Sequence, residues 1–253
     1  MFFKNFKVWE TEFAGRKLSV ETGKMAGLAN ASVMVRYGDT NVLCTVTASA
    51  KPREGVDFFP LSVDYEEKMY SVGRIPGSFQ RREGRASEKA ILTSRCIDRP
   101  IRPLFPKDLR NDCSVVATVM SVDPDCSPEI AAMIGVSTAI AISDIPWDGP
   151  ISGVNVGLVD GEIVLNPTLE QRAKTDLNLT VASTADLVAM IEAGGNEISD
   201  DLMFDCIMAG HEENKKIVKF IQGIVDEIGK PKFAYESSDP DPEIMKEIED
   251  FCI

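Results

Sequence analysis

The chain has 253 residues, of which 44% are hydrophobic and 26% are charged, which is typical of a folded protein with a full core. Its formal net charge of −13 excludes a protein that coats nucleic acid or an anionic membrane through its overall charge. The longest apolar run, over residues 130–145, is too short to cross a bilayer. We therefore expect no membrane partner, and we expect any contact with an anion to come from a local patch.

Cysteine and histidine usage narrows the chemistry further. The six cysteines show no C-x-x-C spacing and the first residues lack the apolar run of a signal peptide, so we expect free thiols in a cytoplasmic protein. The single histidine, His211, follows Gly210, which predicts a break between two helices and a histidine without a catalytic role. P-loop and dinucleotide-binding glycine motifs are absent from the sequence.

The first part of the chain is predicted to form strands. Between two of them, Gly38 and Asp39 occupy the centre of a hairpin turn that needs a positive φ. In the last of them, the side chains of Leu61, Val63 and Tyr65 alternate onto one face. The predicted strands cover residues 3–9, 16–20, 31–36, 41–48 and 58–65.

Positive charge is concentrated between Arg74 and Arg110. This stretch holds eight arginines and two lysines against four acids, a net of +6 in a chain whose total is −13. Gly77 and Gly84 bound its first part, so residues 78–83 are predicted to form a loop. An acidic protein that gathers positive charge in one short segment uses that segment to meet an anion.

A helix is predicted to follow this loop. Ser87 is suited to cap its N-terminus, and Pro100 is expected to end it at Arg99. The residues expected to face the core are Ile91, Leu92 and Ile97. The residues expected to form one basic stripe at helical spacing are Arg95, Arg99 and Arg102.

The rest of the chain alternates between strands and helices. A strand is predicted over 113–121, a buried helix from Pro128 to the residue before Pro146, and a hairpin around Asp160 and Gly161. Further strands over 177–182 and 187–193 precede helices over 199–209 and 213–228, a polar linker over 236–242 and a helix from 242 to 253. The last pattern has no cap, so we expect the native protein to continue. This order predicts an α+β fold with mixed sheets packed against helices.

Two long motifs carry a resemblance to a known family. Ile75–Glu88 (IPGSFQRREGRASE) and Ile97–Phe105 (IDRPIRPLF) resemble the first core domain of the polynucleotide phosphorylase family of bacteria, and Asp57–Leu61 and Ala132–Gly135 match as well. The resemblance covers residues 1 to about 240. It implies a ribonuclease PH-like fold of the ribosomal protein S5 domain 2 type. It divides the chain into an N-terminal lobe at 1–145, a C-terminal lobe at 146–234 and, at 235–253, a linker with the start of a helical segment.

The resemblance also implies an activity for the full-length protein. Members of the family are polyribonucleotide nucleotidyltransferases that degrade single-stranded RNA from its 3′ end with inorganic phosphate and release nucleoside diphosphates. They require Mg²⁺, form a ring-shaped homotrimer and can join an RNA-degradation complex. In the catalytic second core of the family, serines at a helix N-terminus bind phosphate, and two aspartates near a lysine hold the metal.

This chain departs from that catalytic pattern. The positions that correspond to the phosphate-binding serines are Ser127, Pro128 and Glu129, and Glu129 would repel phosphate by ~1 kcal/mol even in a solvated site. The positions that correspond to the aspartates and lysine are Glu170, Asp176 and Asn178. Glu170 and Asp176 remain possible metal ligands, but we expect a core domain that is not catalytic and holds no metal.

The resemblance assigns RNA contacts to the basic stretch. Phe79, Arg81 and Arg82 correspond to the loop that narrows the RNA channel, where an aromatic ring stacks on bases and arginines bind phosphates. Gln80 departs from the second aromatic residue that is common there. Further RNA contacts are expected from Arg95, Arg99 and Arg102, although a structural salt bridge is an equal alternative for Arg99 and Arg102.

Three functions remain open from the sequence alone. The chain is expected to be the non-catalytic core of a phosphorolytic exoribonuclease that supplies ring assembly and RNA-channel contacts. It could instead act in isolation only as an RNA-binding and assembly module. It could also be a self-sufficient ribonuclease PH-like enzyme that uses Glu170 and Asp176.

Overall fold

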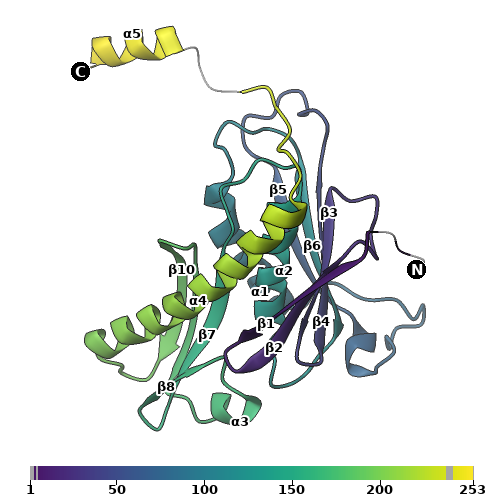
Figure 1. The fold of residues 1–253 in the computed structure, drawn as a ribbon, viewed down its shortest axis with the longest axis vertical. Helices are drawn as coiled ribbons and strands as arrows, with labels where there is room; N and C mark the ends of the chain where they lie inside the picture. The colour runs from purple at the N-terminus through teal and green to yellow at the C-terminus, as the bar shows by residue number, and fades with distance from the viewer. Residues whose placement is uncertain (1–2, 4, 238–241, 253) are drawn as a thin grey trace.

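The computed structural model describes residues 3, 5–237 and 242–252. Within them, strands form a six-stranded sheet in the order β1-β2-β3-β4-β6-β5 and a four-stranded sheet in the order β10-β9-β7-β8 (Figure 1). The strands of the first sheet are β1 Lys7–Phe13, β2 Arg16–Thr22, β3 Ala31–Tyr37, β4 Thr40–Ala48, β5 Leu61–Glu67 and β6 Cys113–Ser121. Those of the second are β7 Ser152–Val159, β8 Glu162–Leu165, β9 Leu177–Ser183 and β10 Val188–Gly195.

The first sheet is mixed, as the sequence predicts. β1 to β4 form an antiparallel meander, and β5 pairs with β6 in parallel. The predicted turn at Gly38 is confirmed, with a φ of +57°. A Cβ on Gly38 would lie 2.6 Å from the sulfur of Cys126, so the position also needs glycine for space.

Two strand boundaries in this sheet were predicted wrongly. The first strand begins at Lys7 rather than Phe3, because a tight turn with positive φ at Ala14 and Gly15 pairs Phe13 with Arg16 and sets the register. β5 begins at Leu61 and runs on to Glu67. Of its three alternating residues, Tyr65 is buried and the other two pack partly buried against the core.

A single helix forms the centre of the molecule. α2, Pro128–Ile142, packs against β3 and β4 on one side and against β7 on the other, so it lies between the two sheets. Every residue of α2 except Glu129 is buried. Close approach to the first sheet depends on Gly135, where a Cβ would lie 2.5 Å from the sulfur of Cys44. Buried side chains from both sheets therefore form one continuous core.

The helix after the basic loop, α1, differs from its prediction in two ways. It spans Glu88–Ile101 and is followed by the 3₁₀ helix η2, Arg102–Leu104, so Pro100 lies inside it rather than beyond its end. Proline removes only one helical hydrogen bond, and burial of Pro100 and Ile101 offsets that loss. The inward face consists of Ala90, Thr93, Ile97, Pro100 and Ile101.

The prediction that Ile91 and Leu92 face the core was wrong. Their side chains are 51% and 63% exposed, whereas Ile97 is fully buried as predicted. The small residues Ala90 and Thr93 take the inward positions because α1 packs closely on β5 and the start of α2. Hydrophobicity alone therefore selects the wrong face of this helix.

The predicted break at residues 209–211 was also wrong. α4 is one continuous helix, Asp200–Ile228, and it packs on β7 and β9. Gly210 lies where the helix comes closest to the sheet, since a Cβ there would lie 3.0–3.2 Å from the methyl groups of Val154, Val156 and Val181. His211 is buried inside the helix and does not end it. The glycine therefore marks a packing contact rather than a helix end.

The remaining elements complete the described chain. η1, Met69–Val72, follows β5, and the short helix α3, Leu169–Arg172, precedes β9. The predicted C-terminal helix corresponds to α5, Pro242–Cys252, while most of the predicted linker over 236–242 and Ile253 lie outside the described residues. Within the described part of the chain, no helix is long and apolar enough to cross a membrane.

Candidate nucleic-acid interface

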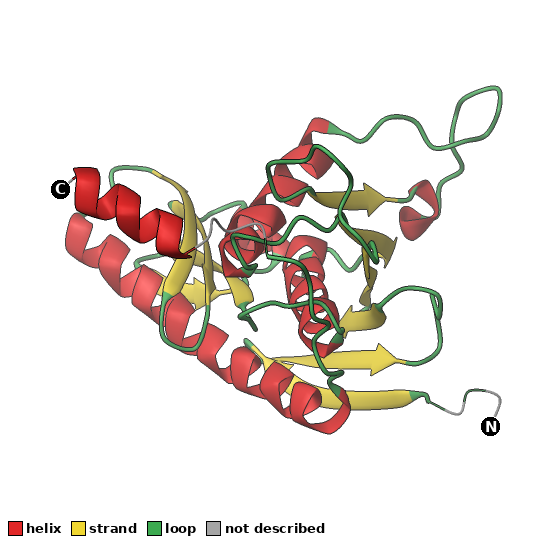
Figure 2. Cartoon of the chain, turned by 90° about the horizontal axis from the view of Figure 1, so that it is seen from above, coloured by secondary structure: helices red, strands yellow, loops and turns green. Residues whose placement is uncertain are grey.

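The basic loop extends away from the body between η1 and α1 (Figure 2). Phe79 is fully exposed near its tip. A tight turn shapes this tip, because the Arg81 N–H donates to the Ser78 carbonyl at 3.0 Å and the Arg82 N–H donates to the Ser78 hydroxyl at 3.3 Å. Arg81 adopts a φ of +52° in this turn. The three residues predicted to bind RNA thus lie together on one exposed turn.

Two contacts hold the second half of the loop. On the side of η1, the Met69 N–H donates to the Glu83 carboxylate at 2.9 Å. On the side of α1, the predicted cap is confirmed, since the Ser87 hydroxyl accepts from the Ala90 N–H at 3.1 Å. The tip is exposed, while the segment that leads from it to α1 is held by specific contacts.

The basic stripe on α1 divides into paired and unpaired members. Arg99 donates to Glu192 of β10 at 2.7 Å, and Arg102 forms an ion pair with Asp98 at 2.7 Å. Arg102 also donates to the Leu61 carbonyl at 3.1 Å. Arg95 is exposed and has no hydrogen bond or ion pair to any residue that the structure describes. Arg99 and Arg102 therefore have the structural salt bridges that were the alternative to RNA contact, while the charge on Arg95 is free to meet a ligand.

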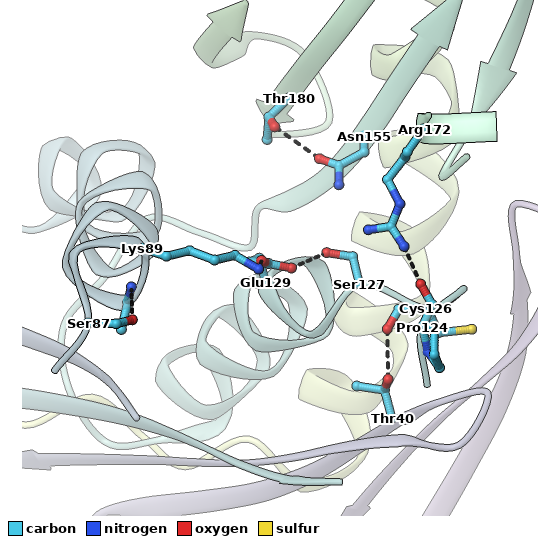
Figure 3. Close-up of polar contacts among 11 residues, drawn as sticks. Thr40, Ser87, Lys89, Pro124, Cys126, Ser127, Glu129, Asn155, Arg172 and Thr180 are labelled. Atoms are coloured by element: carbon cyan, nitrogen blue, oxygen red, sulfur yellow. Dashed lines mark hydrogen bonds and ion pairs between the residues drawn. The ribbon is translucent and has the colours of Figure 1, made fainter. Parts of the chain in front are cut away.

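A cleft of about 810 Å³ lies between the basic loop and the N-terminus of α2. The loop contributes Arg82 and Arg85 to it, and the opposite wall holds Lys89, Glu129 and Arg172. Figure 3 shows that Lys89 of α1 reaches across to Glu129 at the first turn of α2. A helix N-terminus with free N–H groups is a place that suits an anion such as phosphate.

Glu129 fills that place with a carboxylate of the chain itself. One of its oxygens pairs with the Lys89 ammonium at 2.7 Å, and the other accepts a short hydrogen bond from the Ser127 hydroxyl. Burial opposes the charge, but the bonds from Lys89 and Ser127 outweigh it, so the pKa of Glu129 lies below its ordinary value. Pro128 supplies no N–H. Two side-chain donors at this point, Lys89 and Ser127, are therefore occupied by Glu129, and Pro128 offers no third.

Two residues of this cleft were not predicted from the sequence. Tyr65 is buried, and its hydroxyl has no hydrogen-bond partner in the described part of the chain. Burial and the nearby charges of Glu129 and Glu67 raise the pKa of Tyr65, which keeps the hydroxyl protonated. Arg172 donates to the Pro124 carbonyl and links α3 to the segment before α2 (Figure 3). No local motif indicates the Arg172 contact, because Pro124 lies far away in the sequence.

The candidate metal ligands lie outside this cleft. Glu170 is exposed in the first turn of α3, and Asp176 is exposed just before β9, where its N–H donates to the Leu158 carbonyl at 2.9 Å. Asn178 is exposed on β9. Among the residues that the structure describes, no group of three or more histidine, cysteine or acidic side chains could hold a metal ion. Glu170 and Asp176 are therefore not part of any larger group of such side chains within the described chain.

Comparison with known proteins identifies this arrangement. The chain resembles the crystal structure of rice (Oryza sativa) Rrp46 with a TM-score of 0.65 at 16% identity, over 88% of this chain and 95% of that one, which supports a ribonuclease PH-like fold. The models of the 3′ exoribonuclease family match residues 14–146 as domain 1 and residues 149–213 as domain 2. The chain belongs to this family, and the resemblance carried by the basic stretch is confirmed.

Curated relatives narrow the assignment to one branch of the family. The chain is 63% identical to the polyribonucleotide nucleotidyltransferase of Ruminiclostridium cellulolyticum and 58% identical to that of Clostridioides difficile. These matches cover 98% and 97% of this chain. The chain spans 35% of the length of each of these two relatives, so it corresponds to the N-terminal portion of a protein of that kind.

Proposed function

We propose that this chain is the non-catalytic N-terminal core of a 3′-to-5′ phosphorolytic exoribonuclease that converts RNA and phosphate into nucleoside diphosphates. In this proposal the chain supplies RNA contacts and assembly surfaces, and the chemistry takes place in the part of the protein beyond it. The relatives named polyribonucleotide nucleotidyltransferase support the overall reaction.

The proposal rests on one observation, that a carboxylate of the chain itself lies at the N-terminus of α2. Phosphorolysis needs free N–H and hydroxyl donors around the attacking phosphate, because these donors stabilise the charge of the transition state. Here Glu129 occupies the position of the phosphate, and both Lys89 and Ser127 already bind it. A phosphate that approached this point would meet a charged carboxylate in place of a donor.

RNA contact is assigned to the tip of the basic loop. Phe79 is exposed for stacking on a base, and Arg81 and Arg82 flank it on the same turn. Stacking on an aromatic ring and pairing with phosphate are both independent of base identity, which suits an enzyme that draws in any single strand. Arg95 extends the contact along α1, whereas Arg99 and Arg102 serve first to hold α1 against its neighbours.

The remaining assignments concern the full-length protein. Mg²⁺ is placed beyond this chain, since Glu170 and Asp176 are not part of a cluster that could hold a metal. The full-length protein is assigned a homotrimeric ring, a place in an RNA-degradation complex and a cytoplasmic location, all of which follow the family resemblance. We also propose that residues 1–145 and 146–234 form the N-terminal and C-terminal lobes of the core.

One assay separates the candidate functions. The 253-residue chain is incubated with poly(A), phosphate and Mg²⁺, and release of ADP is measured. We expect no release. ADP release that disappears in Asp176→Ala would instead favour a self-sufficient enzyme. If the chain binds RNA without releasing ADP, the isolated chain acts as a binding module, as the proposal requires.

A further inference from the structure

Lys89 occupies an unfavourable position for a lysine. It lies in the first turn of α1, just after the cap Ser87, where the partial positive charge of the helix dipole repels a cation. Glu88 beside it is favourable there, so the turn does not lack an acid. A local conflict of this kind indicates that the residue is needed for a contact outside its own helix.

That contact is the ion pair with Glu129. The Lys89 ammonium lies 2.7 Å from the Glu129 carboxylate, whose side chain is only 25% exposed. Glu129 is itself fixed by Ser127 and lies at the positive end of α2, where a carboxylate is stabilised. α2 is the most deeply buried element of the fold, so this carboxylate is a rigid anchor.

The pair joins the anchor to the end of the basic loop. Ser87 ends the loop and Lys89 follows it by two residues, so the point where the loop enters α1 is held against the start of α2 (Figure 3). A second contact joins the same half of the loop to η1, since the Met69 N–H donates to the Glu83 carboxylate. The same cleft is lined by Arg82 of the loop and by Lys89 and Glu129 of the body. The distance from Arg82 to the ion pair is therefore the distance between the loop and the body.

We propose that Lys89 and Glu129 are positioning residues for the RNA-binding loop, and this rests on the function proposed above. In this view the chain keeps a carboxylate at the α2 N-terminus as an internal anion. The anion holds the lysine of α1, and the loop that enters α1 presents Phe79, Arg81 and Arg82 to RNA. Loops that are ordered before binding lose less entropy when they meet their ligand.

The test uses the full-length assembled protein with Lys89→Met, which keeps the aliphatic stem and removes the charge. Lys89→Arg is the conservative variant that restores the ion pair. Lys7→Met is the matched control, since Lys7 forms an ion pair with Glu227 that is also 2.7 Å long but lies on β1 and α4. The readouts are KM and kcat for a long single-stranded RNA, the same constants for a trinucleotide too short to reach the loop, and the rate of trypsin cleavage after Arg81 and Arg82.

We expect Lys89→Met to raise KM for the long RNA by about three- to tenfold, which is the scale of ordering one or two side chains on binding. Constants for the trinucleotide should not change. Trypsin cleavage at the loop should become faster by a similar factor, because cleavage follows the population of the open loop. Lys89→Arg and Lys7→Met should match the parent protein in all three measurements.

An unchanged KM and cleavage rate in Lys89→Met would overturn the positioning role. Equal losses on long and short RNA would overturn it as well, since they would indicate general damage to the fold. Arg81→Ala with Arg82→Ala, measured in parallel, tests the proposed function separately. If that double variant raises KM for long RNA and Lys89→Met does not, only the positioning role fails. If the double variant has no effect, the RNA-binding loop itself is refuted.

Discussion

The N-terminus of α2 and the tip of the basic loop differ in whether their charged side chains are paired within the chain. At the helix, the Glu129 carboxylate is paired with Lys89 and Ser127, so a group of the chain itself already occupies these two donors. At the loop tip, Phe79 and the arginines beside it project into solvent with their binding groups free of the body. In the function proposed above, this difference assigns RNA contact to the loop and leaves the helix N-terminus without a phosphate site.

The loop tip should account for the largest functional effect. Replacing Phe79, Arg81 and Arg82 together with alanine in the full-length protein should raise KM for long RNA by ~10²-fold or more, because one stacked base and two phosphate contacts are lost. Degradation of a trinucleotide should be preserved. Kinetics on RNAs of graded length check this, and a loss that is equal at every length would contradict the assignment.

A charge reversal at the N-terminus of α2 should cause the largest loss of stability. Glu129→Lys places a second cation beside Lys89 and at the positive end of α2, so we expect the free energy of unfolding to fall by about 2–3 kcal/mol. Denaturant unfolding of the 253-residue chain measures the change. Glu10→Lys is the control, since Glu10 forms an exposed ion pair with Lys17 and should cost ~1 kcal/mol or less.

The arginines of α1 allow a finer comparison. Arg95→Gln should weaken RNA binding about two- to fivefold and reduce the salt slope by about one charge, because its guanidinium is free to neutralise a phosphate. Arg99→Gln should change the slope less, since Arg99 already pairs with Glu192. Binding titrations over a range of salt concentrations measure both slopes. A larger effect at Arg99 would show that RNA displaces Glu192.

Lowering the pH should slightly reduce the contribution of Glu129 to the stability of the fold. The pKa of Glu129 is lower in the folded chain than its ordinary value of 4.5, so the folded state favours the charged form. Its contribution to stability is present above pH 4.5 and is lost as the pH falls through the folded pKa. Glu129→Gln lacks this pH-dependent contribution. On acidification its free energy of unfolding should therefore fall less than that of the parent chain, by a difference of less than ~1 kcal/mol. Parallel slopes for the two proteins below pH 4.5 would contradict this.

Local sequence signals predicted most of the elements and the exposed loop. The turn at Gly38, the cap at Ser87 and the buried helix after Pro128 each depend on a few adjacent residues, and each was correctly placed. The loop tip was also predictable, because the glycines that bound it and its arginines lie in one short segment. RNA binding by that tip stays a prediction.

The errors arose where distant residues decide the structure. Ile91 and Leu92 were predicted to face inward on hydrophobicity, but Ala90 and Thr93 take the inward positions in that turn of α1. Gly210 was interpreted as a helix end because its packing against the valines of β7 and β9 leaves no local pattern. The tie between Lys89 and Glu129 was missed for the same reason. Its one local sign was a lysine in the first turn of a helix.

The unbroken course of α4 has a consequence for how the protein folds. At 1.5 Å per residue its 29 residues extend about 43 Å, which is enough to cover the second sheet and reach the first. Near its C-terminus Glu227 accepts from both Lys7 and Trp9 of β1, at 2.7 Å each. α4 covers the second sheet, and both sheets pack against α2, so the two sheets share one core. The described body of the chain should therefore unfold in one cooperative transition.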